Sequence, residues 1–344
     1  MNTTGMPPRY PMGRPMMDPQ TYHKEHKRLW HLGNGMGLAV VGTFVVSFLL
    51  SMLILSLQQL LGMDDVSSMN GFAGGEILDQ LTDMMLYIPT MLAPFLVFAK
   101  LSGYRLSSLT PLGKPKISLL VPGVMLGLGG CIVGNILTAL ISSSMGAAGV
   151  ELSSPSVSTP QTLVGQLLFY TSTALIPALV EEFIFRGVVM QSLRRFGDGF
   201  AIVMSSVVFA LMHGNLVQAP FALVVGLTIG YLVIITGSMW VGLIIHFLNN
   251  LFACILQVVF DSISLELASV ISLAYYGILI ALGVVGYVIL HSKKAEFHRF
   301  YQPNPSLTTG QKLSAFLLNP GMIVSIVLIL LVTAQYVHFV GFGG

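Results

Sequence analysis

Residues 179–187, Leu-Val-Glu-Glu-Phe-Ile-Phe-Arg-Gly, place two carboxylates and a guanidinium inside an apolar segment. The eighteen residues before Glu181, from Leu163 to Val180, carry no charge. A helix through them would therefore carry Glu181 well into a lipid bilayer. Ionisable side chains at that depth are costly and often mark functional sites. Glu181 is thus the first candidate functional residue.

The composition is that of an integral membrane protein. Of the 344 residues, 54% are hydrophobic and only 9% are charged, whereas a soluble domain carries about 25% charged residues. Cys131 and Cys254 both lie in apolar segments and are expected to be buried, unpaired side chains. No nucleic-acid partner is expected.

Nine apolar segments approach the roughly 20 residues that a membrane span needs. They cover residues 36–57, 84–99, 118–142, 163–193, 200–214, 219–236, 239–260, 267–291 and 315–339. The sequence therefore predicts an all-α, polytopic transmembrane helix bundle of about eight to nine spans. Residues 31–344 are expected to form a single transmembrane domain, and residues 1–30 a disordered basic tail in the cytoplasm.

The charges divide between two sets of loops. If the nine spans are real, all sixteen Lys and Arg residues fall in the amino-terminal tail, near the end of the fourth span, or in the loops 100–116 and 292–312, all on one side. The opposite loops carry only acids. The positive-inside rule then places the amino terminus in the cytoplasm. We expect the protein to lie in a bacterial plasma membrane.

The two glutamates in residues 179–187 have different predicted roles. Glu182 and Arg186 are four residues apart with the acid first, which is the favoured order for a helical ion pair. We interpret this pair as structural support. Glu181 lies about 100° round the helix and cannot share the pairing equally. In a medium of low dielectric constant it is either a general base or a protonated, hydrogen-bonded core residue.

His213 is predicted to be the partner of Glu181. Gly197-Asp198-Gly199 has the composition of a turn between two helices. Counted from Asp198, Glu181 and His213 both lie roughly 22–26 Å along their helices. Two antiparallel neighbours would bring the carboxylate and the imidazole to one level, and Phe209 would share the helix face of His213.

His246 and Asn250 are four residues apart and thus share one face of a further span. Imidazole and carboxamide donors together suit the stabilisation of an oxyanion. The residues leave two chemistries open. Either Glu181 and His213 activate a water molecule while His246 and Asn250 stabilise the oxyanion, or Glu181, His213 and His246 hold a metal, for which zinc is the candidate.

Three motifs resemble the signature of one family. Glu181-Glu182-x-x-x-Arg186, Phe209-x-x-x-His213 and His246-x-x-x-Asn250 are similar to the motifs of the CPBP family, the CAAX-processing and bacteriocin-related (Abi) intramembrane proteases. The resemblance covers about residues 160–260, which are expected to form a CAAX-protease-like catalytic core.

The resemblance implies a role for each of these positions. Glu181 would activate water with His213 as its partner, and His246 and Asn250 would stabilise the oxyanion. Glu182 and Arg186 would occupy the other polar positions of the first motif. The family is commonly described as metalloproteases, and zinc stays open beside the water-activating glutamate.

The expected function is an intramembrane endopeptidase, of glutamate or metallo type. Its partners would be the lipid bilayer and a peptide or protein at the membrane: a prenylated tail, a leader-type peptide or a membrane-bound regulator. The alternative is a non-catalytic scaffold or peptide-immunity protein on the same fold. A proton-coupled transporter that uses Glu181 and His213 as a relay is a third reading.

Overall fold

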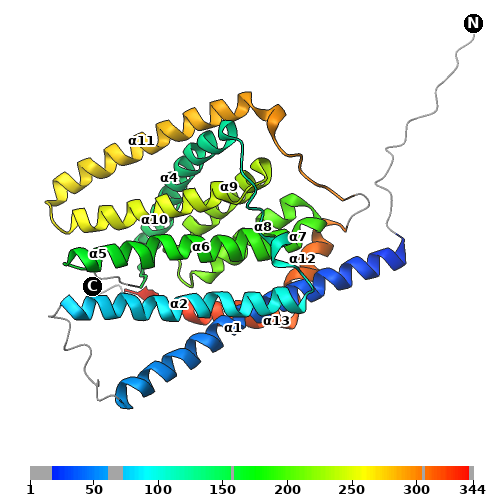
Figure 1. Cartoon of the computed structure of the whole chain (residues 1–344), viewed down its shortest axis with the longest axis horizontal. Coiled ribbons are helices and arrows are strands. Elements are labelled where there is room, and N and C mark those ends of the chain that lie inside the picture. The colour runs from blue at the N-terminus through cyan, green and yellow to red at the C-terminus, as the bar shows by residue number, and fades with distance from the viewer. Residues whose placement is uncertain (1–17, 61–72, 156–158, 304–306, 341–344) are drawn as a thin grey trace, which may run out of the picture.

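A computed structural model describes residues 18–60, 73–155, 159–303 and 307–340, which form a helix bundle (Figure 1). The first helices are α1 (Pro19–Leu60), α2 (Ala73–Leu101), the short α3 (Leu106–Leu109) and α4 (Ile117–Ala147). A composite helix follows, made of α5 (Leu163–Tyr170), a π-helical turn (Thr171–Leu175), α6 (Ile176–Glu182), a second π-helical turn (Phe183–Val189), α7 (Met190–Leu193) and a 3₁₀ turn (Arg194–Phe196). The later helices are α8 (Asp198–Met212), α9 (Ala219–Thr236), α10 (Trp240–Phe260), α11 (Leu265–Ser292), a 3₁₀ turn (Lys294–Glu296), α12 (Thr309–Leu317) and α13 (Pro320–Ala334).

Two three-residue strands are the only sheet in the described part of the chain. β1 (Val150–Leu152) pairs antiparallel with β2 (Val337–Phe339), so that Glu151 lies opposite His338. The prediction of an all-α polytopic bundle is confirmed, and the strands are a small addition at one end of it.

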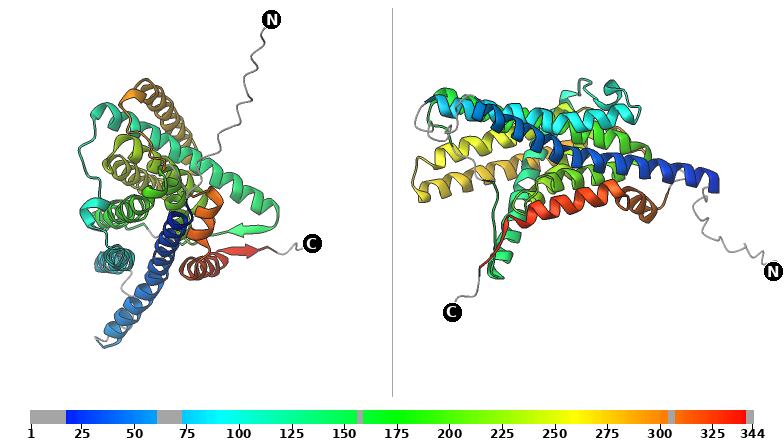
Figure 2. Two further views of the ribbon diagram at one scale, coloured as in Figure 1. Left: turned by 90° about the vertical axis from the view of Figure 1, so that its right-hand side faces the viewer. Right: turned by 90° about the horizontal axis from the view of Figure 1, so that it is seen from below.

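The composite helix packs against α2, α8 and α10. α4 packs against α9 and α11, α8 packs against α9, and α10 packs against α4, α6 and α9. On the other side α1 packs against α2 and α13, and Figure 2 shows α13 running beside α1. At the α8–α9 contact, a Cβ on Gly226 would lie 2.9 Å from the side chain of Ser206, so this glycine is what allows the two helices to meet.

The number of spans is lower than the upper end of the prediction. The described residues contain seven helices that are long and apolar enough to cross a membrane, or eight if α12 and α13 form one span. Those two helices meet at a bend of 73°. The bend follows from Pro320, which cannot continue α12, and from Asn319, which caps α13 by accepting a hydrogen bond from the amide of Met322.

The fifth predicted span, residues 200–214, is the second place where the structure differs from the prediction. α8 has fifteen residues and a length of about 22 Å, which is less than the roughly 30 Å of a bilayer's hydrocarbon core. α8 is therefore too short to cross a bilayer by itself, and it ends at the turn that contains His213. Because Gly214 (φ +62°) adopts the left-handed region, the chain reverses tightly there.

The charged loops gather at opposite ends of the bundle. Arg195 pairs with Glu25 at 2.8 Å, and Lys116 pairs with Glu296 at 3.4 Å, so the basic segments meet at one end. At the other end, the hydroxyl of Thr159 donates to Asp261 at 2.6 Å. This grouping follows the loop partition expected from the sequence, while the side that faces the cytoplasm stays a prediction.

The amino-terminal prediction needs correction where the structure describes it. Residues 19–30 were expected to belong to a disordered tail, but α1 begins at Pro19 and Leu29 is fully buried. Asp18 starts this helix by accepting hydrogen bonds from the amides of Gln20 and Thr21. The Glu25–Arg195 pair then holds the first turns against the bundle. The first seventeen residues of the predicted tail lie outside the described residues.

Candidate active site

The site is built on the composite helix, where α6 lies between two π-helical turns. Glu181 and Glu182 are the last residues of α6, and the second π-helical turn begins at Phe183. Single π-helical turns inside α-helices recur at functional sites because they change the direction of the side chains that follow. Here the turn follows both glutamates directly.

Glu182 and Arg186 form the predicted ion pair, and both are buried. Glu182 Oε1 lies 3.1 Å from an Arg186 terminal nitrogen, and their side chains are 0% and 1% exposed. The Arg186 guanidinium also lies 4.7 Å from the centre of the Phe209 ring, a cation–π contact that stabilises a desolvated cation. The supporting role predicted for these two residues therefore has a structural basis.

Glu181 differs from Glu182 in being reachable. Its side chain is 15% exposed. Its Oε1 accepts a hydrogen bond of 2.6 Å from the hydroxyl of Tyr87, and its Oε2 lies 3.6 Å from Nε2 of His246. Of the two adjacent carboxylates, Glu182 is thus fully buried and Glu181 is partly exposed.

His246 bridges the two glutamates. Its Nδ1 lies 3.0 Å from Oε1 of Glu182, and its Nε2 faces Glu181. A buried carboxylate at one ring nitrogen orients an imidazole and determines which nitrogen is available for chemistry. When the ring is protonated, Nε2 is a donor that points into the accessible side of the site. The sequence had grouped His246 either with Asn250 as an oxyanion donor or with Glu181 and His213 as a metal ligand. In the structure its polar contacts are with the two glutamates.

His213 lies at the end of α8, next to the same aromatic ring. Its Nδ1 lies 2.9 Å from the carbonyl oxygen of Phe209, and its ring packs edge-on against Phe209 at 4.9 Å. The Phe209 ring is also 6.0 Å from that of His246, so the two histidines flank one phenylalanine. Among the described residues, no hydrogen bond or ion pair joins His213 to Glu181.

Asn250 is one helical turn beyond His246 on α10. Its side-chain amide donates to the carbonyl oxygen of Thr173 at 3.4 Å, a long bond, and Asn249 donates to Asn250 at 3.2 Å. Thr173 belongs to the first π-helical turn of the composite helix. The long bond leaves the carboxamide able to turn towards another acceptor.

The proposed metal ligands do not form a cluster. Across the residues that the structure describes, no group of three or more His, Cys, Asp or Glu side chains is arranged to hold a metal ion. The geometry of Glu181, His213 and His246 therefore gives the zinc hypothesis no support.

Two contributors were missed by reasoning from the sequence. Tyr87 comes from α2, 94 residues away from Glu181 along the chain. Asn215 is 1% exposed and donates to the carbonyl oxygen of His213 at 2.8 Å, which holds the turn after α8. The signal for Tyr87 was slight: it is a tyrosine two residues before Pro89 in a short apolar segment.

The fold and this buried polar cluster define a polytopic, α-helical membrane protein with a cluster of ionisable side chains inside the bundle. Residues 163–252 match the family model described as type II CAAX prenyl endopeptidase Rce1-like. This match confirms the resemblance to the CAAX-protease family over the segment that holds every motif residue. Because that is a family of proteases, the match supports a hydrolase. Neither the curated proteins nor the solved structures that were compared contain a match to the chain.

Proposed function

We propose that this protein is an intramembrane endopeptidase in which Glu181 activates the water that attacks a peptide bond. The observation that carries the proposal is the contrast between the adjacent carboxylates. Glu182 is sealed and paired with Arg186, whereas Glu181 is partly exposed and lies beside Nε2 of His246. A purely structural charge network would bury both carboxylates with partners, since an accessible one contributes little to stability.

Each residue of the site then has a role in the proposed reaction. Glu181 removes a proton from water, and the oxygen forms a bond to the carbonyl carbon while the carbonyl π electrons move to its oxygen. Nε2 of His246 and the amide of Asn250 donate to the resulting oxyanion. When the C–N bond breaks, the proton passes to the leaving amine, and the carbonyl forms again as a carboxylic acid. Tyr87 keeps Glu181 oriented through its 2.6 Å hydrogen bond.

His213 is proposed to act from beside Phe209. Its ring packs against Phe209, as the ring of His246 does. From there it would hold the attacking water or the substrate carbonyl. The proposed substrate is a peptide segment that enters from the membrane: a leader-type peptide, a membrane-bound regulator or a prenylated tail.

The test uses purified protein in detergent, the Glu181→Gln variant, and Glu266→Gln as a control at an acid outside the site. Quenched-fluorescent prenylated and leader-type peptides are supplied to each, with and without a chelator. The proposal is supported if the native protein and Glu266→Gln cleave a peptide, Glu181→Gln does not, and the chelator has no effect on cleavage. Cleavage that chelator abolishes and zinc restores would move the mechanism to a metal.

A second arm covers substrates outside the peptide panel. Native protein and Glu181→Gln are expressed in the same host, and the peptide termini generated in its membranes are compared by mass spectrometry. If neither the panel nor the membrane fraction shows a cleavage that depends on Glu181, the peptidase proposal is rejected.

A further inference from the structure

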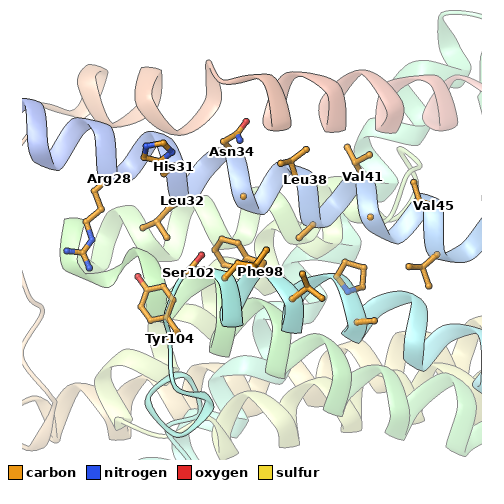
Figure 3. A pocket seen from close by; sticks show the side chains of 18 of the residues that line it. Arg28, His31, Leu32, Asn34, Leu38, Val41, Val45, Phe98, Ser102 and Tyr104 are labelled. Carbon is orange, nitrogen blue, oxygen red and sulfur yellow. The ribbon is translucent and has the colours of Figure 1, made fainter.

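A groove lies between α1 and α2. It has a volume of about 1000 Å³, which is at the upper end of small-molecule sites. Its lining comes from α1 between Lys24 and Val46 and from α2 and the following turn between Ala93 and Tyr104. Figure 3 shows Arg28 and Tyr104 near one end of the groove and Val45 towards the other.

The two ends of the groove differ in chemistry. On α1 the basic residues Lys24, Lys27, Arg28 and His31 stand at positions i, i+3, i+4 and i+7, so they share one helix face. The same face continues as Leu38, Val41 and Val45. The groove is therefore cationic at the end that joins the basic loops and apolar along the rest of its length.

The basic residues at this end lack an acidic partner among the described residues. None of the described residues that line the groove is acidic. The nearby Glu25 is committed to Arg195, on another helix. Within the described ranges, no acidic side chain forms an ion pair with Lys24, Lys27 or Arg28. The neighbouring Tyr104 has its pKa raised by partial burial, with Arg28 and Arg195 acting in the opposite direction.

The apolar part has an open side and a close-packed floor. Leu38, Val45 and Val97 are each more than half exposed, so the groove is open to the lipid phase. The floor forms because a Cβ on Gly42 would lie 3.0 Å from the Pro94 ring. α1 from His31 to Val41 spans about 15 Å, which is half the hydrocarbon thickness of a bilayer. One leaflet's acyl chain therefore fits along it.

We propose that this groove binds one anionic phospholipid. Its headgroup would be held by Lys24, Lys27 and Arg28, and an acyl chain would lie between α1 and α2. A neutral lipid would satisfy the apolar part only and leave three cations without a counter-charge. A free anion would satisfy the cations only. The combination selects an amphiphile with a negative head.

The test is native mass spectrometry of the full chain in detergent, titrated with phosphatidylglycerol or with phosphatidylcholine of identical acyl chains. The charge variant is Lys24→Gln/Lys27→Gln/Arg28→Gln. Its matched control is Lys293→Gln/Lys294→Gln/Arg299→Gln, which removes the same charge from the same end of the bundle but outside the groove. Since each basic residue near an anionic lipid contributes about a fivefold factor, the charge variant should lose on the order of a hundredfold in affinity for phosphatidylglycerol. The control should change by less than about fivefold, the contribution of a single such residue.

A second pair of variants tests the position of the acyl chain. Val45→Trp fills the groove, and Leu53→Trp places the same side chain on an exposed part of α1 outside it. Only Val45→Trp should weaken binding. Equal binding of the neutral lipid, equal losses in both charge variants, or equally tight binding of glycerol 3-phosphate would each overturn the proposal. Displacement of phosphatidylglycerol by a prenylated peptide but not by its unprenylated form would also overturn it, by assigning the groove to substrate.

Discussion

The Glu182–Arg186 pair makes the sharpest prediction about stability. Replacing Arg186 by Met keeps much of the side-chain volume but leaves Glu182 buried without its cation. At the observed 3.1 Å, the attraction between two unit charges is about 5 kcal/mol for an effective dielectric constant of about 20. The cost of removing one partner of a buried pair is about 3–5 kcal/mol. Because His246 remains 3.0 Å from Glu182, we expect a loss of about 3 kcal/mol, at the lower end of this range.

The assay is reversible unfolding in mixed micelles, followed by the fluorescence of the protein's two tryptophans, Trp30 and Trp240. Arg186→Met is compared with Glu182→Gln/Arg186→Met, which removes both charges and should recover most of the loss. The matched control is Lys116→Met, which breaks a 3.4 Å pair whose lysine is 65% exposed and should cost at most about 1 kcal/mol. Equal losses in Arg186→Met and Lys116→Met, or no recovery in the double variant, would refute the reasoning.

Three further outcomes follow from the site and the basic end of the bundle. Tyr87→Phe removes the hydrogen bond to Glu181 but no bulk, so peptidase kcat should fall roughly tenfold to a hundredfold while KM and thermal stability stay close to native; a change in KM alone would contradict a positioning role. Asn250→Ala removes a proposed oxyanion donor and should lower kcat by about 10²–10³ without weakening the binding of an uncleaved substrate analogue. Hydrogen bonding from Ser118 is the main cause that lowers the pKa of Glu296 from its ordinary 4.5. The stability that Glu296 contributes should therefore be complete above pH 4.5 and disappear as the pH falls through its lowered pKa. The advantage of native protein over Glu296→Gln in thermal unfolding should accordingly be present at pH 7 and absent in strong acid.

Much of the architecture could be predicted from the sequence because membrane spans are local properties. In lipid, a segment of about 20 apolar residues must satisfy its own backbone by forming a helix. The nine predicted segments all contain helices, and the departures occur where length or proline intervenes. α8 is shorter than a full crossing, and Pro320 begins a new helix direction after α12. At the amino terminus, hydropathy indicated where apolar residues begin but not that the polar turns of α1 would pack against Arg195.

Part of the candidate site could also be predicted from the sequence. Glu182 and Arg186 lie on one helix at a spacing that brings them together, so their pairing was visible in the sequence. Counting residues from the turn at Asp198 predicted that His213 lies level with Glu181; in the structure His213 lies at the end of α8.

Only the tertiary structure decided the contacts between helices. His246 points towards both glutamates, Tyr87 donates a hydrogen bond to Glu181, and Glu182 is fully buried whereas Glu181 is not. All three features depend on how three helices are rotated about their axes. That rotation is set by packing contacts over the whole length of each helix, which no short motif records. The sequence by itself thus determined the spans and the chemical groups available at the site, and packing determined which of those groups meet.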